Sequence, residues 1–422
     1  MEESRVVGHA PGVRQSPPPR TEGLVNMSLL EIAASFDHND HGMRQRCGAI
    51  YASLRAGCPV FWTEAWGGYW VASRYQDVYE AARDPHRFSS APGVMIPPVG
   101  HGRPLLPMES DPPDHAAYRE LLLPRFAPAA VALLESDVRE FAASLVDGVA
   151  NAGRADLYET LAKPLPLLMI TRLLGIERDD LFWEWVELLM YGRVEGTDAA
   201  TIVATAEALY DFLDHQLELR RAAPGDDLLS LLLEGNVNER PYTQDEILDL
   251  AFFLVIAGIE NTAFSIRATL RHLAVHPDDR AALAADPGLI NNVVEQSLRL
   301  YAPVTGLART AACDTDLGGQ RIRGGDRVLL LFGSANRDET VFEDGDDFHL
   351  NRRDGRHVAF GIGPHRCVGS HLARLEIRIA VEELLRRVPH FELTGPDPGW
   401  YAAGPLQVAW QTAAVVKAGR ES

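Results

Sequence analysis

The stretch FGIGPHRCVGSHLARLE, residues 360–376, places a cysteine, Cys367, directly after a glycine-rich turn. Gly361 and Gly363 allow positive φ and a close approach of the backbone. The spacing of apolar residues after the turn predicts a helix that begins at the cysteine. The N–H groups and the dipole at the start of a helix favour an anion. The sequence therefore predicts a thiolate with one open side, which suits an axial ligand of iron.

Composition limits the class of protein. The chain has 422 residues, 46% hydrophobic and 23% charged, which is typical of a soluble globular protein. A net charge of −19 argues against nucleic-acid binding, which needs a basic surface. The four cysteines, Cys47, Cys58, Cys313 and Cys367, form no CxxC pair. Unpaired thiols are typical of a reducing compartment, so we expect a cytoplasmic protein.

The chain divides into a short tail and one large unit. Residues 1–25 are rich in proline and polar residues, which predicts a flexible tail. Residues 26–422 are expected to form a single domain that acts as a monomer. The longest apolar run, from Leu250 to Ile259, is too short for a bilayer and suits a buried core helix, so no membrane contact is expected.

The order of elements predicts a mainly α fold with small β-sheets. Residues 59–73 have the pattern of two strands around Gly67 and Gly68, and residues 91–113 form a long loop dense in glycine and proline. Residues 114–303 are almost wholly helical in pattern. A helix from a capping box at residues 243–246 to His276 would be about 50 Å long and would cross the whole body.

The cysteine stretch resembles the haem-ligand loop of the cytochrome P-450 superfamily, whose pattern is FGxGxHxCxG. The bland alternative, a buried thiol in a glycine-rich turn, leaves five further similarities unexplained. They occur in the family's order: DPPDHAAYR (111–119), AGIENT (257–262), PVTGLART (303–310), ANRD (335–338) and FHLNRR (348–353). The resemblance covers roughly residues 40–415 and is strongest to the soluble bacterial members.

The resemblance implies a cytochrome P-450 fold, with a long central helix crossing a helical body that contains haem b. Cys367 matches the axial ligand of the haem iron. The positions that bind the rest of the cofactor correspond to His115, Arg119, Arg309, Phe360, Gly361, His365 and Gly369. Taken singly, each charged residue among them is more often an ordinary surface charge. His115 and Arg119 are four residues apart, so one helical face can present both to a haem propionate.

The first departure from the family lies in VEQSLRLYAP, residues 294–303. The family has Glu-x-x-Arg, with a third partner arginine near Arg352. Here Gln296 stands at the glutamate position, so Arg299 receives an amide hydrogen bond that is weaker by about 1–2 kcal/mol. Glu295 lies about 100° round the helix and is expected to face elsewhere. We predict a weaker scaffold beside the haem, with function retained.

The second departure lies in AGIENT. Ala257, Gly258 and Glu260 match the family, but Asn261 holds the alcohol position and Thr262 follows it. Gly258 is expected to let the helix bulge beside the iron. An amide is no hydroxyl relay, and Thr262 can serve only if the helix is re-registered.

Four interpretations of Asn261 remain open. Protons arrive through a water chain from Glu260, or they come from a substrate hydroxyl. The reaction is peroxide-assisted or non-hydroxylating, or Asn261 is simply tolerated and the chemistry is ordinary.

The substrate pocket is expected on the open side of the haem. Its expected lining is the loop 91–109 with Phe253, Leu254, Val304, Thr305 and Leu307. Residues 185–205 are expected to act as a lid, with Leu406 as a further contact. This lining is mostly apolar, which predicts a moderately hydrophobic small molecule without identifying it.

A basic segment suggests an electron donor. Residues 349–378 carry six arginines against Asp354 and Glu376, a local excess of +4 in an acidic chain. The bland alternative is charge with a structural role; the sharper one is docking of an acidic ferredoxin. The chain has no recognisable flavin or iron–sulfur module, so electrons are expected from NAD(P)H through a separate ferredoxin reductase and ferredoxin.

The resemblance thus implies a haem-thiolate monooxygenase. It would insert one atom of dioxygen into a small organic substrate by hydroxylation or epoxidation, in specialised metabolite biosynthesis. One alternative is another oxidation, such as desaturation, aryl coupling or a peroxide-driven reaction. The other is a haem or ligand binder that has lost turnover, which the two departures motivate.

Overall fold

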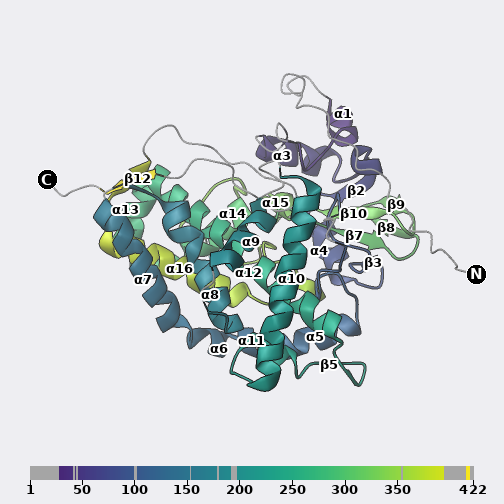
Figure 1. The fold of residues 1–422 in the computed structure, drawn as a ribbon. Helices are drawn as coiled ribbons and strands as arrows, with labels where there is room; N and C mark the ends of the chain where they lie inside the picture. The colour runs from purple at the N-terminus through teal and green to yellow at the C-terminus, as the bar shows by residue number, and fades with distance from the viewer. Residues whose placement is uncertain are drawn as a thin grey trace, which may run out of the picture.

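The computed structural model describes residues 28–40, 43, 46–98, 102–152, 154–177, 180–191, 197–352, 355–393 and 415–418. Helices fill most of the body, and a sheet lies at one side of it (Figure 1). This is the mainly α architecture with small sheets that the sequence predicts. The predicted tail, residues 1–25, and Leu406 lie outside the described residues.

The central element is helix α12, Gln244–Val275. Thr243 caps it: its hydroxyl accepts the N–H of Glu246, whose carboxylate accepts the N–H of Thr243. Pro277 begins the next helix, α13 (Pro277–Ala285), because its ring suits the first turn of a helix. The 32 residues of α12 span about 48 Å, so the predicted long helix is confirmed.

Helix α12 is long and apolar enough to cross a membrane, by length and composition alone. However, 72% of its most apolar window is buried inside the protein. A core helix satisfies the same test, so burial within the fold accounts for its apolar sequence.

Four helices pack around α12: α8 (Pro164–Leu174), α10 (Ala199–Ala222), α14 (Ile290–Tyr301) and α16 (Ser370–Arg387). Helix α7 (Glu135–Ala152) covers α16 from the outside. One large apolar cluster fills the space between these helices. The site described below lies where this body meets the sheet.

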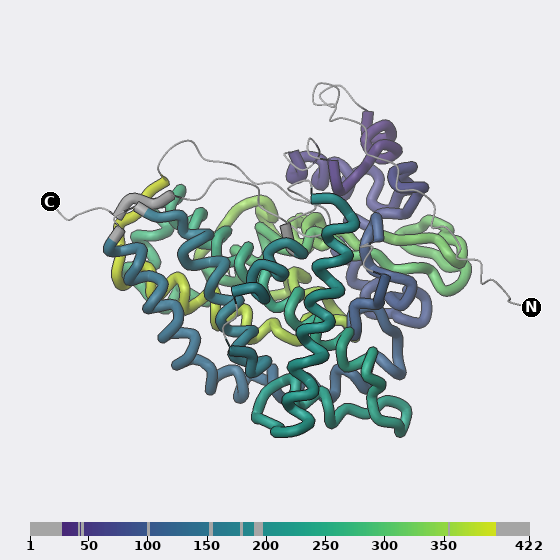
Figure 2. The backbone as a smooth tube through the Cα atoms, in the orientation of Figure 1, coloured from purple at the N-terminus to yellow at the C-terminus, as the bar shows by residue number. Residues whose placement is uncertain are grey.

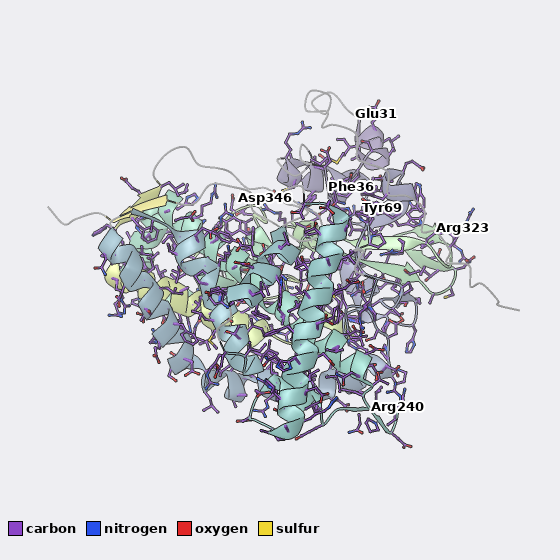
Figure 3. All side chains as sticks on the ribbon, in the orientation of Figure 1. Glu31, Phe36, Tyr69, Arg240, Arg323 and Asp346 are labelled. Atoms are coloured by element: carbon purple, nitrogen blue, oxygen red, sulfur yellow. The ribbon has the colours of Figure 1, made fainter. Side chains whose placement is uncertain are left out.

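The main sheet has five strands in the order β1-β2-β10-β7-β3, namely Val60–Thr63, Tyr69–Ala72, Arg327–Leu330, Leu307–Ala311 and Phe88–Ser89. All neighbours are antiparallel except β2 and β10. Figure 2 shows the purple N-terminal strands beside the green strands from late in the chain. Phe36 and Tyr69, labelled in Figure 3, are buried in the apolar cluster next to this sheet.

The predicted hairpin is β1 and β2, and the turn contains Gly67 and Gly68, both with positive φ. The smaller sheets are β11-β12-β4 (Phe391–Leu393, Val415–Ala418, Arg154–Asp156), β5-β6 (Asn236–Val237, Arg240–Pro241) and β8-β9 (Thr315–Leu317, Gln320–Ile322). The remaining helices are α1 Leu29–Ala34, α3 Cys47–Gly57, α4 Tyr75–Arg83, α5 Asp114–Leu122, α6 Pro128–Ala132, α9 Asp180–Tyr191, α11 Leu228–Leu232 and α15 Phe332–Ala335. Single turns are η2 Ala65–Gly67, η3 Leu123–Phe126, η4 Tyr158–Ala162, η5 Pro287–Leu289 and η6 Gly363–His365.

Candidate functional site

The segment around Cys367 is a closed turn between the strand side of the fold and α16. The N–H of Cys367 donates to the carbonyl of Phe360 over 2.8 Å, and the N–H of Arg366 donates to Gly363 O over 3.1 Å. Gly361 and Gly363 have φ of 64° and 70°. A Cβ on Gly363 would lie 2.7 Å from Ala82 O at the end of α4, so a side chain there would clash. Local sequence thus fixes the position of the cysteine.

The expected start of the following helix needs correction. Helix α16 begins at Ser370 and not at the cysteine, because the Phe360 and Gly363 hydrogen bonds hold residues 366 and 367 in a turn. Cys367 therefore lies three residues before the helix.

Cys367 is an exposed residue whose thiol is nevertheless surrounded by protein atoms. The protein around the sulfur is dense enough that burial raises the pKa of the thiol. A hydrogen bond from the Gly369 N–H and the charges of Arg119, Arg366 and Arg374 oppose that rise without overcoming it. Burial thus opposes the predicted thiolate, whereas the Gly369 N–H and the three arginines favour it. A bound cation would supply the missing charge.

Four positively chargeable side chains converge next to this turn. His115 and Arg119 lie on α5, Arg309 on β7 and His365 in η6. The rings of His115 and His365 are 3.9 Å apart, and His365 Nε2 is 3.2 Å from Ser90 Oγ. Arg119 Nη2 donates to the carbonyl of Arg366 over 2.7 Å. The structure thus brings together all four residues that the family resemblance assigned to haem propionates.

The electrostatics of this cluster favour an anion. Burial lowers the pKa of His115 to about 4, and the charges of Arg119 and Arg309 act in the same direction. Burial and the same two arginines lower the pKa of His365 to about 2. Burial lowers the pKa of Arg309 to about 10. Neither Arg119 nor Arg309 forms an ion pair within the described part of the chain. A carboxylate among these groups would relieve their desolvation and mutual repulsion.

One atom of the cluster points to a missing partner. His115 is 2% exposed, and its Nε2 has no hydrogen-bond partner among the described residues. Buried polar atoms are nearly always satisfied, so this nitrogen is suited to a group that carries an oxygen. The donor set therefore fits the two carboxylates of a haem.

Helix α12 presents one open stripe. Phe253, Ile256, Ala257 and Asn261 are half-buried, whereas most of the helix around them is fully buried. These positions recur at three- and four-residue spacing and so share one helical face. Leu254 and Thr262 are 6% exposed and lie off this stripe. The open face of α12 thus carries Asn261 and not the neighbouring threonine.

The expected bulge in α12 is absent: the helix is continuous from Gln244 to Val275. A Cβ on Gly258 would lie 3.1 Å from Ile170 Cδ1, so the glycine permits close packing of α8 on α12. Re-registration that would turn Thr262 onto the open face does not occur. Glu260 is buried, and its charge raises the pKa of Arg267, which burial lowers overall.

The expected pocket residues divide between open and buried positions. Phe253, Val304 and Leu307 are half-buried, whereas Thr305 is 2% exposed. A separate cavity of about 210 Å³ lies between α8, α9 and α12, with Ile259, Trp183 and Lys163 in its wall. It contains none of the five expected pocket residues. Part of the expected lid, residues 192–196, lies outside the described residues.

Gln296 and Arg299 form the pair that the sequence predicts, in which a neutral amide accepts hydrogen bonds from a guanidinium. Both are buried, and Arg299 Nε and Nη2 donate to Gln296 Oε1 over 3.2 and 3.0 Å. The remaining donors of Arg299 bind the carbonyls of Asn336, Gly345 and Asp347. Arg352 instead donates to the carbonyls of Glu343 and Asp344. Burial lowers the pKa of Arg299 to about 10, and the charge of Arg352 adds to that shift.

Sequence reasoning missed the role of Glu295. It faces away from Arg299, as expected, but it binds Arg374 through two hydrogen bonds of 2.6 and 3.0 Å. His357 Nε2 lies 3.0 Å from the same carboxylate. Both partners flank the cysteine in sequence, and only the fold brings them to α14. Nothing in the sequence around His357 (HVAFG, 357–361) or Arg374 (SHLAR, 370–374) indicated that either residue would contact Glu295.

Two of the six arginines in the predicted basic segment form ion pairs with carboxylates. Arg374 pairs with Glu295, and Arg378 pairs with Glu135 and Glu382. Arg366 is exposed, and its guanidinium makes no ion pair with the described residues. The expected surface of six free arginines is thus reduced, with Arg366 as its clearest member.

Known proteins are similar to this chain over most of its length. The cytochrome P450 family model matches residues 287–397. The chain is 35% identical over 375 residues to a steroid C26-monooxygenase of Mycolicibacterium smegmatis, covering 87% of this chain and 91% of that one. It is 34% identical over 363 residues to linalool 8-monooxygenase of Pseudomonas putida, covering 82% and 89%.

Solved structures show the same fold. Cytochrome P450 PksS of Bacillus subtilis superposes with a TM-score of 0.81 at 28% identity, covering 91% of this chain and all of that one. CYP109Q5 of Chondromyces apiculatus gives a TM-score of 0.80 at 30% identity, covering 91% and 97%. The conserved fold, the cysteine turn and the extended similarity to monooxygenases together show that this chain belongs to the cytochrome P450 family of haem-thiolate monooxygenases.

Proposed function

We propose that Cys367 is the axial ligand of haem b and that His115, Arg119, Arg309 and His365 hold its propionates. The observation that carries this proposal is the convergence of two arginines and two histidines, all buried or half-buried, beside a cysteine turn. Phe360, Gly361 and Gly369 would shape the side of the pocket next to the sulfur. When bound, thiolate-ligated haem supplies dioxygen binding and O–O cleavage.

The open stripe of α12 is proposed as the opposite wall of the haem pocket. Phe253, Ile256 and Ala257 exclude water there, because their side chains offer no hydrogen-bonding group. Asn261 is the polar group on the same face. Its amide can hold a water molecule by donating or accepting a hydrogen bond, but it cannot pass a proton as a hydroxyl does.

The proton source is proposed to be the carboxyl group of Glu260, one turn beyond Ala257. It is 4% exposed and lies about 100° round the helix from Asn261, so a bound water is needed to join the two side chains. Glu260 would donate its proton to that water, and the Asn261 amide would orient the water toward the pocket. This arrangement replaces the alcohol relay of the family.

The substrate is proposed to be a small, moderately hydrophobic organic molecule that receives one oxygen atom by hydroxylation or epoxidation. Phe253, Val304 and Leu307 are apolar and half-buried, which suits such a ligand. Relatives are named for steroid and linalool oxidation, and one similar structure contains testosterone. Two further similar structures are hydroxylases from himastatin and leinamycin biosynthesis, which supports a role in specialised metabolism.

Electrons are proposed to come from NAD(P)H through a separate ferredoxin reductase and ferredoxin. An acidic ferredoxin would dock on the side of the cysteine turn, where Arg366 is exposed. We further propose that the enzyme acts in the cytoplasm as a monomer.

A turnover assay tests this function. Terpenes and steroids are first screened for shifts of the haem absorption band, and binders are then incubated with NADPH, a ferredoxin reductase and a ferredoxin. The proposal predicts a product heavier by one oxygen atom, formed in proportion to NADPH consumed. Product that appears only with hydrogen peroxide would replace the proposal with the peroxide-driven alternative. Absence of product from every binder under both conditions would support a binder without turnover.

A further inference from the structure

We propose that Glu295 is a positioning residue for the axial cysteine, acting through His357, Arg374 and Phe360. The inference rests on the proposed haem binding by Cys367 and adds a residue to that site. His357 precedes the cysteine by ten residues and Arg374 follows it by seven, so one carboxylate on α14 holds both ends of the cysteine segment.

The carboxylate of Glu295 is held as an anion. Arg374 Nε donates to Oε1 over 2.6 Å and Nη2 donates to Oε2 over 3.0 Å, which is a bidentate pair. The His357 side chain is 1% exposed, and its Nε2 lies 3.0 Å from Oε2 of Glu295. The Ala359 N–H donates to His357 Nδ1 over 3.3 Å, so Nε2 carries the proton and donates to Glu295.

The contacts continue from this cluster to the sulfur. The Arg374 guanidinium lies 4.4 Å from the centre of the Phe360 ring, and the His357 ring lies 6.1 Å from it on a tilt. The carbonyl of Phe360 accepts the N–H of Cys367. Arg374 Nη1 also donates to Ser370 O in the first turn of α16. Loss of the Glu295 carboxylate therefore frees both Phe360 and the backbone that orients the cysteine.

The neighbouring pair has a different task. Within the described part of the chain, Gln296 and Arg299 reach the cysteine segment through Asn336, whose Oδ1 accepts the N–H of Val358 over 2.7 Å. This series of hydrogen bonds includes the uncharged side chain of Gln296, and it ends at Val358, two residues before Phe360. Glu295 is the anionic residue of α14 that contacts the segment, through His357 and Arg374.

The test uses Glu295→Gln, which keeps the size of the side chain and removes its charge. The full chain is loaded with haem, and three properties are measured: the ferrous–carbonyl spectrum, the rate of haem transfer to an acceptor protein, and the reduction potential. We expect part of the band to move from about 450 nm to about 420 nm, as thiolate ligation is lost. Haem transfer should become about tenfold faster, and the potential should become more positive because Arg374 is left unbalanced.

Control variants separate positioning from simple stability. Gln296→Glu changes the adjacent residue of α14 and should leave the band at about 450 nm, as in the wild type, because it keeps the contacts of Glu295. His357→Gln should shift the band in the same direction as Glu295→Gln, and it serves if Glu295→Gln does not fold. Glu295→Asp should restore part of the band at about 450 nm, since it returns the charge.

The outcomes distinguish this inference from the function beneath it. A wild-type protein without the band at about 450 nm overturns haem-thiolate binding itself. A normal wild type, with folded Glu295→Gln and His357→Gln variants that keep its band, potential and haem-transfer rate, overturns the role of Glu295 alone. Lower melting temperatures with an unchanged band and potential would also overturn it, since they show only a structural role.

Discussion

At the scale of single residues, Asn261 separates this chain from the family pattern most directly. It lies on the open face of a continuous helix, whereas Thr262 is buried beside it. The alcohol of the family is therefore not recovered by a local shift of the helix. On the proposed mechanism, Glu260 and water deliver the proton. The alternatives are a substrate hydroxyl, a peroxide-assisted or non-hydroxylating reaction, and ordinary chemistry that tolerates Asn261.

Asn261→Thr tests that interpretation. A hydroxyl at this position adds a relay, so the fraction of NADPH converted to product should rise and hydrogen peroxide release should fall. The gain should be about tenfold or less, because a sole proton donor contributes about 10²–10⁴-fold and a water route is already present. Thr262→Val is the matched control and should leave coupling unchanged. Uncoupling by Thr262→Val, with no effect of Asn261→Thr, would place the relay at Thr262.

A second residue-scale prediction concerns the buried arginine of α14. Gln296→Glu gives Arg299 a carboxylate in place of an amide oxygen at 3.0–3.2 Å. A charged hydrogen bond exceeds a neutral one, so the free energy of unfolding should rise by about 1–2 kcal/mol. Thermal melts and haem retention provide the measurement. No gain in either would show that the carbonyls around Arg299 already satisfy it.

At the scale of elements, α16 contains a buried acid that the haem site does not use. Glu376 is 2% exposed, and its Oε2 has no hydrogen-bond partner within the described part of the chain. Burial raises its pKa well above the usual range. The folded protein therefore keeps a proton there that the unfolded chain releases above its ordinary pKa of about 4.3.

This difference predicts a pH-dependent effect of Glu376→Gln. Because the folded state binds more protons than the unfolded state, Glu376 favours folding at low pH, and that contribution is lost as pH rises toward its folded pKa. Stability should thus fall by up to about 1.4 kcal/mol per pH unit in the wild type, and Gln removes this slope. Urea unfolding of both proteins at pH 5.5, 6.5 and 7.5 measures it. Parallel stability curves would mean that Glu376 is ionised in the folded protein.

Local pattern predicted the elements better than it predicted their contacts. The α12 capping box, the β1–β2 hairpin and the cysteine turn depend on residues a few positions apart, so spacing was enough. The start of α16 was placed three residues early, because carbonyls of Phe360 and Gly363 hold the chain in a turn before the helix begins. The predicted bulge at Gly258 failed because the glycine accommodates Ile170 from another helix.

In the candidate site too, residues in local motifs were predictable and long-range contacts were not. The cation cluster was predictable from motifs, since His115, Arg119, Arg309 and His365 each lie in a recognisable stretch. The Glu295 cluster was not, because it joins residues 62 and 79 positions apart in sequence. The free charge of residues 349–378 was overestimated partly for the same reason. Glu135 of α7 pairs with Arg378 from 243 positions away, whereas Glu382 pairs with it locally within α16.

At the scale of the whole molecule, a net charge of −19 would repel an acidic ferredoxin unless docking is local. Arg366 is exposed next to the cysteine and therefore carries the clearest local attraction. Arg366→Glu should slow reduction by ferredoxin about tenfold at low ionic strength, and the difference should shrink in 1 M salt, where screening acts within about 3 Å. Stopped-flow reduction under carbon monoxide measures the rate.

Arg321→Glu is the control for that experiment. Arg321 lies on β9, in the small hairpin at the edge of the fold, and its side chain is 62% exposed (Figure 1). It changes the net charge by the same amount as Arg366→Glu. Equal slowing by both variants would mean that net charge matters and that the cysteine face is not the docking site.

The central claim is that Cys367 ligates haem iron, and the carbon monoxide difference spectrum of the reduced protein tests it most directly. The account predicts a band at about 450 nm for the wild type and its loss in Cys367→Ala, which keeps the rest of the fold. A band at about 420 nm in the wild type, or one at about 450 nm that survives Cys367→Ala, would contradict it.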